Sequence, residues 1–202
     1  MTTNNKIELM APAGNFESLQ AALDNGCDSV YFGVEQLNMR ARASVNFTMD
    51  DLAEIAKRCE AKNVRSYLTL NTIIYDHDLS VVKTLINKAK EANITAVIAS
   101  DQAVIAMARS VGMEVHISTQ LNVTNIETIK FYSLFADTMV LSRELSLRQV
   151  KKITEQIEKE QIKGPNGNLV EIEIFGHGAL CMAVSGKCYL SLHSDNSSAN
   201  RG

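Results

Sequence analysis

Two cysteines near the end of the chain, Cys181 and Cys188, lie in a glycine-containing segment that could bind a metal. Cysteine thiolates are soft ligands and favour iron–sulfur clusters or zinc over cations that prefer oxygen. Two thiolates do not complete a cluster, so a zinc site that includes His177 or His193 is an alternative. Cys181 could also be a nucleophile with His177 as its base, or both thiols could only pack the loop.

The other two cysteines, Cys27 and Cys59, come before and after the second expected strand, and we expect buried structural thiols there. The N-terminal segment MTTNNKIELM lacks a charged region followed by an apolar one, and no apolar run approaches the roughly 18 residues of a membrane span. We therefore expect a cytoplasmic protein with no membrane segment and no disulfides. The net charge of −3 indicates neither a basic nucleic-acid surface nor an acidic tail.

Short β-branched runs alternate along the chain with segments of helical period. The expected strands are residues 7–10, 29–32, 66–70, 96–99, 115–118, 138–141 and 170–175. Between them, apolar residues recur at helical spacing, as in Phe16, Leu19 and Leu23. This alternation predicts a parallel sheet, either doubly wound or a (β/α)8 barrel that lacks one unit. A length of 202 residues with 46% apolar content fits one domain.

Polar side chains occupy or follow the ends of the expected strands. In a barrel, the loops at the carboxyl ends of the strands form the catalytic face, so such residues are candidates for chemistry. The catalytic candidates are Asn71, His116, Gln120, Arg143, Glu144 and His177, and the substrate-binding candidates are Glu8, Arg40 and Arg42. Arginine suits contacts with phosphate or carboxylate groups. A structural role is the alternative: Arg143 can pair with Glu144, and His116 can be a hydrogen-bonded core histidine.

The segment around the two late cysteines also carries a resemblance. Residues 173–181, EIFGHGALC, and the following MAVSGKCYLS resemble the signature of the collagenase-like peptidase U-32 family. The resemblance extends to ELMAPAG at 8–14, DSVYFG at 28–33, LSRELS at 141–146 and SANRG at 198–202. It implies a TIM-like (β/α) barrel, incomplete here, with about seven βα units. Residues 1–202 would then be the N-terminal barrel domain of a longer family pattern.

The resemblance also implies a function. Similar proteins include enzymes that hydroxylate tRNA uridine or ribosomal RNA cytidine, with prephenate as an implicated metabolite, and proteins that hydroxylate ubiquinone precursors. Several bind a four-iron four-sulfur cluster through four cysteines, and Cys181 and Cys188 match two of these. The resemblance thus implies an iron–sulfur-dependent RNA hydroxylase, with RNA and a small metabolite as partners.

Two other functions stay open. A collagenase-like peptidase is the first, although the sequence contains no His-Glu-x-x-His or Gly-x-Ser-x-Gly element. A non-catalytic barrel that only docks an RNA or a protein is the second, because a fold alone does not determine an activity.

Overall fold

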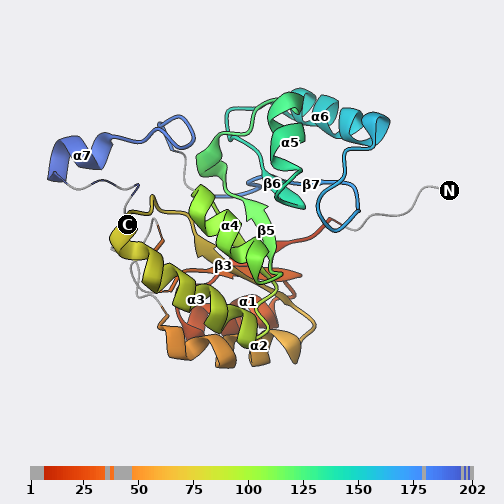
Figure 1. The fold of residues 1–202 in the computed structure, drawn as a ribbon. Helices are drawn as coiled ribbons and strands as arrows, with labels where there is room; N and C mark the ends of the chain where they lie inside the picture. The colour runs from red at the N-terminus through yellow and green to blue at the C-terminus, as the bar shows by residue number, and fades with distance from the viewer. Residues whose placement is uncertain are drawn as a thin grey trace.

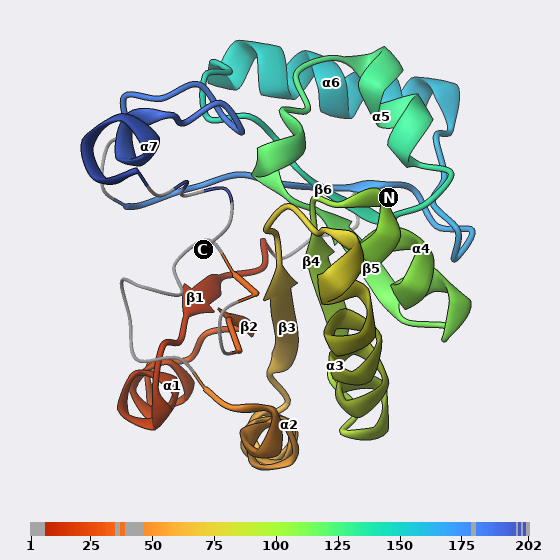
Figure 2. The same cartoon turned by 60° about the vertical axis from the view of Figure 1, so that its left-hand side comes forward.

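The computed structural model describes residues 7–34, 37–38, 47–178, 181–196, 198 and 200. Its central element is a sheet of seven parallel strands in sequential order. The strands are β1 (Met10–Pro12), β2 (Ser29–Phe32), β3 (Arg65–Leu70), β4 (Ala96–Ala99), β5 (Glu114–Ile117), β6 (Thr138–Val140) and β7 (Glu171–Glu173). The sheet curls, and β1 and β7 are its two edges (Figure 2). The described chain is therefore an incomplete α/β barrel, as predicted.

Helices return the chain from each strand to the next. They are α1 (Phe16–Asp24), α2 (Leu52–Glu60), α3 (Leu79–Glu91), α4 (Gln102–Ser110), α5 (Ile126–Tyr132), α6 (Leu147–Glu160) and α7 (Leu190–Asp195). Short 3-10 helices are η1 (Met49–Asp51), η2 (Asp76–Asp78) and η3 (Thr119–Leu121). α7 follows β7 and lies apart from α1 to α4 (Figure 1). None of the helices in the described ranges is long and apolar enough to cross a bilayer.

Asparagine side chains determine where two of the helices begin. Asn15 Oδ1 accepts a hydrogen bond of 2.8 Å from the Ser18 backbone N–H at the start of α1. Asn125 Oδ1 accepts one of 3.0 Å from the Thr128 backbone N–H at the start of α5. These caps bind N–H groups that have no partner within the helix.

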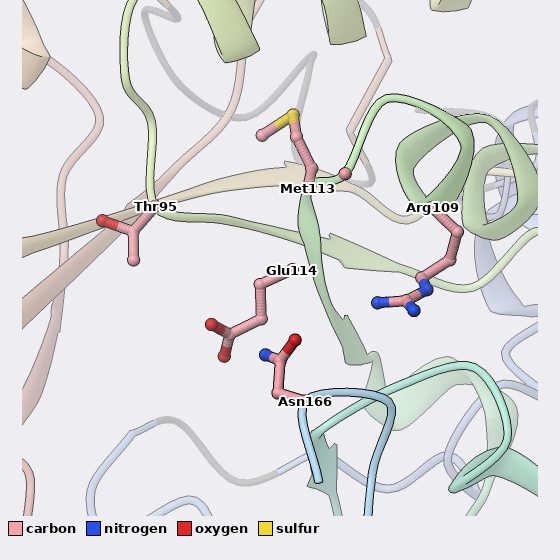
Figure 3. Close-up of a pocket in the computed structure, with 6 residues that line it drawn as sticks. Thr95, Arg109, Met113, Glu114 and Asn166 are labelled. Carbon is pink, nitrogen blue, oxygen red and sulfur yellow. The ribbon is translucent and has the colours of Figure 1, made fainter.

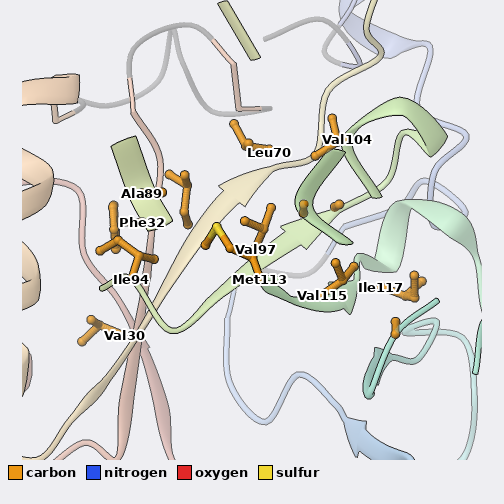
Figure 4. Packing of buried hydrophobic residues seen from close by; sticks show 14 of the residues in the cluster. Val30, Phe32, Leu70, Ala89, Ile94, Val97, Val104, Met113, Val115 and Ile117 are labelled. Atoms are coloured by element: carbon orange, nitrogen blue, oxygen red, sulfur yellow. The ribbon is translucent and has the colours of Figure 1, made fainter. Parts of the chain in front are cut away.

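The main core lies between the convex face of the sheet and the helices (Figure 4). Strand residues that contribute to it include Val30, Phe32, Leu68, Val97, Val115 and Ile117. The concave face has a much smaller apolar cluster of Tyr67, Ala96 and Ile98. Side chains alternate between the two faces along each strand, so neighbours such as Tyr67 and Leu68 lie in different environments.

The edge strands differ from their predicted bounds. The first was expected at 7–10 but forms at Met10–Pro12, and the side chains of Ile7 and Leu9 ahead of it are 90% and 62% exposed. The seventh was expected at 170–175 but ends at Glu173, and the apolar Ile174 and Phe175 that follow are exposed. Apolar residue type predicts a strand only where a neighbouring element covers it. The strands between them lie within one residue of prediction.

Candidate functional site

The cysteine loop, residues 181–188 after β7, is anchored to β5 and β6 through Ser185. Ser185 is fully buried, and its backbone N–H donates a 2.8 Å hydrogen bond to Glu144 Oε1. Its hydroxyl lies 3.1 Å from Glu144 Oε2 and 3.5 Å from Thr119 Oγ1. Glu144 follows β6 and Thr119 follows β5. One buried serine therefore joins the loop to two strand ends.

Gly186 allows the cysteine loop to approach the chain after β5 closely. Its φ of 74° lies in the left-handed region, which favours glycine. A methyl group on Gly186 would also overlap the backbone carbonyl of Gln120. Gln120, one of the predicted catalytic residues, therefore lies beside the loop and contacts it through its backbone.

Arg143 joins the end of β6 to the cysteine loop. Its Nη2 donates a 3.3 Å hydrogen bond to the Ala183 carbonyl oxygen. Hydrogen bonding to the Arg143 guanidinium, with help from the Ala183 backbone, lowers the pKa of the Cys181 thiol. Cys181 is exposed, and Cys188 is half-buried. Cys181 is thus an accessible thiol with an increased thiolate fraction, as metal ligation or redox chemistry requires.

Glu144 is directed at the loop through Ser185. Burial raises the pKa of Glu144, but the hydrogen bonds from the Ser185 backbone and hydroxyl outweigh it, and the pKa falls below its ordinary value. An ionised carboxylate only accepts hydrogen bonds, so Glu144 holds the donor groups of Ser185 in place. The two residues that were predicted to be catalytic at this strand end, Arg143 and Glu144, both position the loop.

Further predicted residues lie at the same end of the sheet. Asn71 follows β3, and the exposed His177 follows β7. The chain also returns to this end, because the Ile73 backbone N–H donates to the Asn200 carbonyl oxygen at 2.9 Å. The segment after β7 therefore spans the carboxyl ends of the strands from β7 back to β3.

The predicted zinc alternative lacks a ligand group in the described part of the chain. Among those residues, no three His, Cys, Asp or Glu side chains are grouped as a metal site would require. His177 and His193 are both exposed. The cysteine loop by itself supplies two thiols.

His116 and Glu8 contact charged groups outside the cysteine loop. His116 is inside β5 on the concave face, where its side chain is 4% exposed and its Nε2 lies 3.1 Å from Glu114 Oε1. Glu8 was predicted to lie within the first strand, but it precedes β1 and lies at the amino end, where it forms an ion pair with Arg65. This difference follows from the later start of β1.

Sequence reasoning missed Ser185, Glu114 and Glu173. Ser185 lies between the two cysteines, so its place in the motif was a usable signal. Glu114 is two residues from His116 in the same strand, and the alternation of side chains would have placed both on one face. Arg40 and Arg42 lie outside the described residues.

Cys27 and Cys59 are buried in the main core, and both are free thiols. Burial raises the pKa of Cys59 to about 11 and also raises the pKa of Cys27. Both observations confirm the prediction of structural thiols that form no disulfide.

A pocket of about 370 Å³ lies at the opposite end of the sheet from the cysteine loop (Figure 3). It is lined by Thr95, Arg109, Gly112, Met113, Glu114 and Asn166. Thr95 and Met113 precede β4 and β5, so the pocket opens at the amino ends of these strands. Glu114, which lines the pocket, also contacts His116 on the concave face.

Several known proteins are similar to this chain over nearly its whole length. A protein named Collagenase from Porphyromonas gingivalis strain W83 is 58% identical over 198 residues, covering 98% of this chain and 48% of that protein. The tRNA hydroxylation protein P1 of Bacillus subtilis is 32% identical over 200 residues, covering 98% of this chain and 44% of that protein. The chain thus spans about half the length of the curated relatives that it matches.

A solved structure and a family model both match this chain. The solved structure of the U32 peptidase Mk0906 has a TM-score of 0.63 at 14% identity, covering 86% of this chain and 69% of that chain, which is a likeness of fold. The model of peptidase family U32 matches residues 14–202. These residues include every strand from β2 to β7 and the whole cysteine loop. The chain therefore belongs to peptidase family U32.

Proposed function

We propose that the chain is the barrel part of an enzyme that hydroxylates a base in RNA, with a cysteine-bound iron–sulfur cluster. The observation that carries this proposal is the cysteine loop fixed at the carboxyl ends of β5 and β6. This loop carries an accessible thiol with a lowered pKa, Cys181, and a half-buried one, Cys188. A relative that spans 98% of the chain is named a tRNA hydroxylation protein, which supports RNA as the substrate.

The donor set of the cysteine loop fits part of a four-iron four-sulfur cluster. Cys181 and Cys188 would supply two thiolates, and the cluster needs two more from outside the described residues. When bound, such a cluster transfers single electrons. Ser185 and Glu144 would keep the loop at the strand ends, while the Arg143 guanidinium would hold Cys181 in its thiolate form.

The Arg143 guanidinium is the group at the cysteine loop that would bind an anionic partner. Arg143 reaches the loop with its guanidinium, and arginine suits phosphate and carboxylate groups. An RNA phosphate, or a carboxylate of a co-substrate such as prephenate, would bind favourably there.

The test uses the full-length protein purified without oxygen. We expect a brown protein that contains iron and sulfide, and hydroxylated nucleosides in the RNA of a deletion strain that carries the wild-type gene. Cys181→Ala and Cys188→Ala should remove the colour, the iron and the hydroxylation, while circular dichroism stays unchanged. Cys27→Ala is the matched control, because it removes a buried thiol elsewhere, and it should keep all three. Full hydroxylation by the double cysteine variant would refute the proposal.

A peptidase is the second candidate, and the 58% identity to a protein named Collagenase favours it. Hydrolysis by Cys181 would need a base in contact with its sulfur. The side chain that is hydrogen-bonded to this thiol is Arg143, which is a cation and cannot act as that base. Assays of collagen and gelatin cleavage with the same variants separate the two candidates. Loss of cleavage with unchanged RNA hydroxylation would favour the peptidase, and absence of both activities from the wild-type protein would favour a non-catalytic scaffold.

A further inference from the structure

The pocket at the amino ends of β4 and β5 is lined by two side chains of opposite charge, Arg109 at the end of α4 and Glu114 at the start of β5. Figure 3 shows Glu114 and Asn166 directed into one space, with the Arg109 guanidinium turned toward it from α4. The volume of about 370 Å³ suits a small molecule, since ligand pockets begin at about 300 Å³. The pocket is therefore large enough for a ligand that reaches both charges.

The two charges do not neutralise each other. Within the described ranges, Arg109 forms no ion pair and its guanidinium donates no hydrogen bond. Glu114 Oε1 lies 3.1 Å from His116 Nε2, whereas Glu114 Oε2 has no hydrogen-bond partner among the same residues. The hydrogen bond with His116 lowers the pKa of Glu114, and the charges of His116 and Arg65 lower it further, so the carboxylate is ionised at neutral pH. The pocket thus presents a guanidinium and a carboxylate oxygen that can both bind a ligand.

Hydrogen bonds fix the backbone on both sides of the pocket. The Gly112 N–H donates a 3.0 Å bond to the Arg109 carbonyl oxygen, and Lys90 Nζ donates one of 2.8 Å to the Gly112 carbonyl oxygen. These bonds hold the turn from α4 to β5. The Asn166 backbone N–H donates a 2.9 Å bond to Asp137 Oδ1, which holds the loop between α6 and β7. The lining is therefore formed before any ligand arrives, as is usual for small-molecule sites.

Two neutral side chains add hydrogen-bonding groups to the lining. Thr95 Oγ1 accepts a 3.1 Å hydrogen bond from the Ser66 backbone N–H, so the hydroxyl proton of Thr95 can be donated to a ligand. The side-chain amide of Asn166 can donate and accept. Both groups are suited to orient a polar molecule between the two charges.

The charge pattern selects the kind of ligand. A guanidinium binds a carboxylate through two parallel hydrogen bonds, and a carboxylate binds an ammonium group. A simple anion would bind Arg109 but would be repelled by Glu114, and a simple cation would meet the opposite pair of effects. A molecule that carries both a carboxylate and an ammonium group is attracted by both side chains.

We propose that this pocket binds a small zwitterion of the amino-acid class, with its carboxylate on Arg109 and its ammonium group on Glu114. Thr95 and Asn166 supply further hydrogen bonds to the carboxylate. The pocket lies at the opposite end of the sheet from the cysteine loop, so this proposal does not rest on the function proposed for that loop.

The first test titrates the full-length wild-type protein with glycine, β-alanine and 4-aminobutyrate, which differ in the separation of their two charges. The backbone amide signals of Gly112 and Asn166, observed by NMR at pH 7, report on the pocket. We expect at least one of the three compounds to shift both signals with saturation at millimolar concentrations. Absence of a saturable shift with all three compounds would overturn the proposal.

Matched compounds that lack one charge test the need for both groups. They are acetate and methylammonium for glycine, propionate and ethylammonium for β-alanine, and butyrate and propylammonium for 4-aminobutyrate. Each should bind about tenfold more weakly than its zwitterion, because one charge-assisted hydrogen bond is lost. Equal affinity of the zwitterion and either matched compound would show that one of the two charges has no role.

The second test compares variants of the full-length protein. Arg109→Gln and Glu114→Gln should each weaken binding of the zwitterion about tenfold. Arg148→Gln on α6 and Glu60→Gln on α2, which remove exposed charges of the same signs, should leave the affinity unchanged. Circular dichroism checks the fold of each variant, and Arg109→Gln alone decides the question if Glu114→Gln fails to fold. Wild-type affinity of Arg109→Gln would overturn the assignment.

Discussion

The side chains on the two faces of the sheet lie in different environments. On the convex face, Leu68 of β3 is fully buried in an apolar core that the helices cover. On the concave face, the next residue, Thr69, has a buried hydroxyl with no hydrogen-bond partner. Burial of apolar area stabilises a protein, whereas a buried polar atom without a partner destabilises it. The convex face therefore stabilises the fold through its apolar core. The concave face contains buried polar atoms without a hydrogen-bond partner among the described residues.

This difference indicates how the barrel divides its tasks. On the concave face, His116 Nδ1 and Glu173 Oε2 are buried without a hydrogen-bond partner among the described residues, which lowers stability. If the polar groups of the concave face had no role in binding or catalysis, replacing them with apolar groups would raise the free energy of unfolding and leave every activity unchanged. Four measurements test the contrast.

The largest effect is expected from neighbours in β3. Leu68→Ala removes buried apolar atoms and leaves a cavity, so the free energy of unfolding should fall by about 3 kcal/mol. Thr69→Val replaces an unpartnered hydroxyl with a methyl group, and the free energy of unfolding should change by less than about 1 kcal/mol, towards greater stability. Denaturation by urea measures both. Equal losses for the two variants would remove the contrast between the faces.

A smaller effect with a defined pH dependence is expected at Glu173. Burial raises its pKa, so the folded state holds the proton more tightly than the unfolded state. The resulting stabilisation is complete below the ordinary pKa and is lost as the pH rises through the raised pKa. Glu173→Gln is neutral at every pH and should raise the free energy of unfolding at pH 7 by about 1 to 2 kcal/mol.

Urea denaturation near pH 3 provides the control for Glu173→Gln. The carboxyl group is largely protonated there in both states, so the variant should have nearly the same stability as the wild type. A lower stability of Glu173→Gln at pH 7 would show that another group already neutralises this carboxylate.

The cysteines extend the contrast to reactivity. In the iron-free full-length protein, iodoacetamide should modify Cys181 at pH 7 and leave the core thiols Cys27 and Cys59 intact, because burial raises the pKa of both. Arg143→Gln should slow the reaction of Cys181 several-fold at pH 7, since the guanidinium lowers the thiol pKa. The difference should disappear above about pH 9, where free thiols are largely ionised.

Mass spectrometry of the modified peptides follows each thiol separately. Arg148→Gln is the matched control, because it removes an exposed arginine from α6 and should leave the rate unchanged. Equal slowing by both arginine variants would assign the effect to net charge rather than to the bond with Arg143.

The smallest effect is expected at the outer surface of the helices. Lys88 Nζ lies 3.1 Å from Asp50 Oδ1, but the Asp50 side chain is 91% exposed. Water and salt screen such pairs, so Lys88→Gln should change the free energy of unfolding by less than about 0.5 kcal/mol. Thermal denaturation measures this change. A loss comparable to that of Leu68→Ala would show that surface charge contributes as much as the core.

The bounds of the inner strands, β2 to β6, could be predicted from the sequence, whereas those of the edge strands β1 and β7 could not. β2 and β4 have the predicted bounds because their apolar runs are covered by neighbouring strands and helices. Ile7 and Leu9 are also apolar, but their side chains are largely exposed, and β1 begins only at Met10. Periodicity also left two topologies open, since the order of strands depends on contacts between distant segments.

The candidate site was predictable as a set of chemical groups but not as an arrangement. The cysteine motif indicated thiol chemistry near the carboxyl ends of the strands, where Arg143 also lies. The buried bond between Ser185 and Glu144 could not be predicted, because it joins residues far apart in sequence. The contact of His116 with Glu114 depends on which way the two side chains point, and a single residue type does not determine that.

The sequential order of the strands has a consequence for how the chain acquires its structure during synthesis. Each strand from β2 to β7 pairs with the strand that was translated just before it. No pairing has to wait for a distant segment, and neighbouring βα units can form in turn as the nascent chain leaves the ribosome. The cysteine loop is translated after all seven strands, so its docking by Ser185 would be a late event, on strand ends that have already formed.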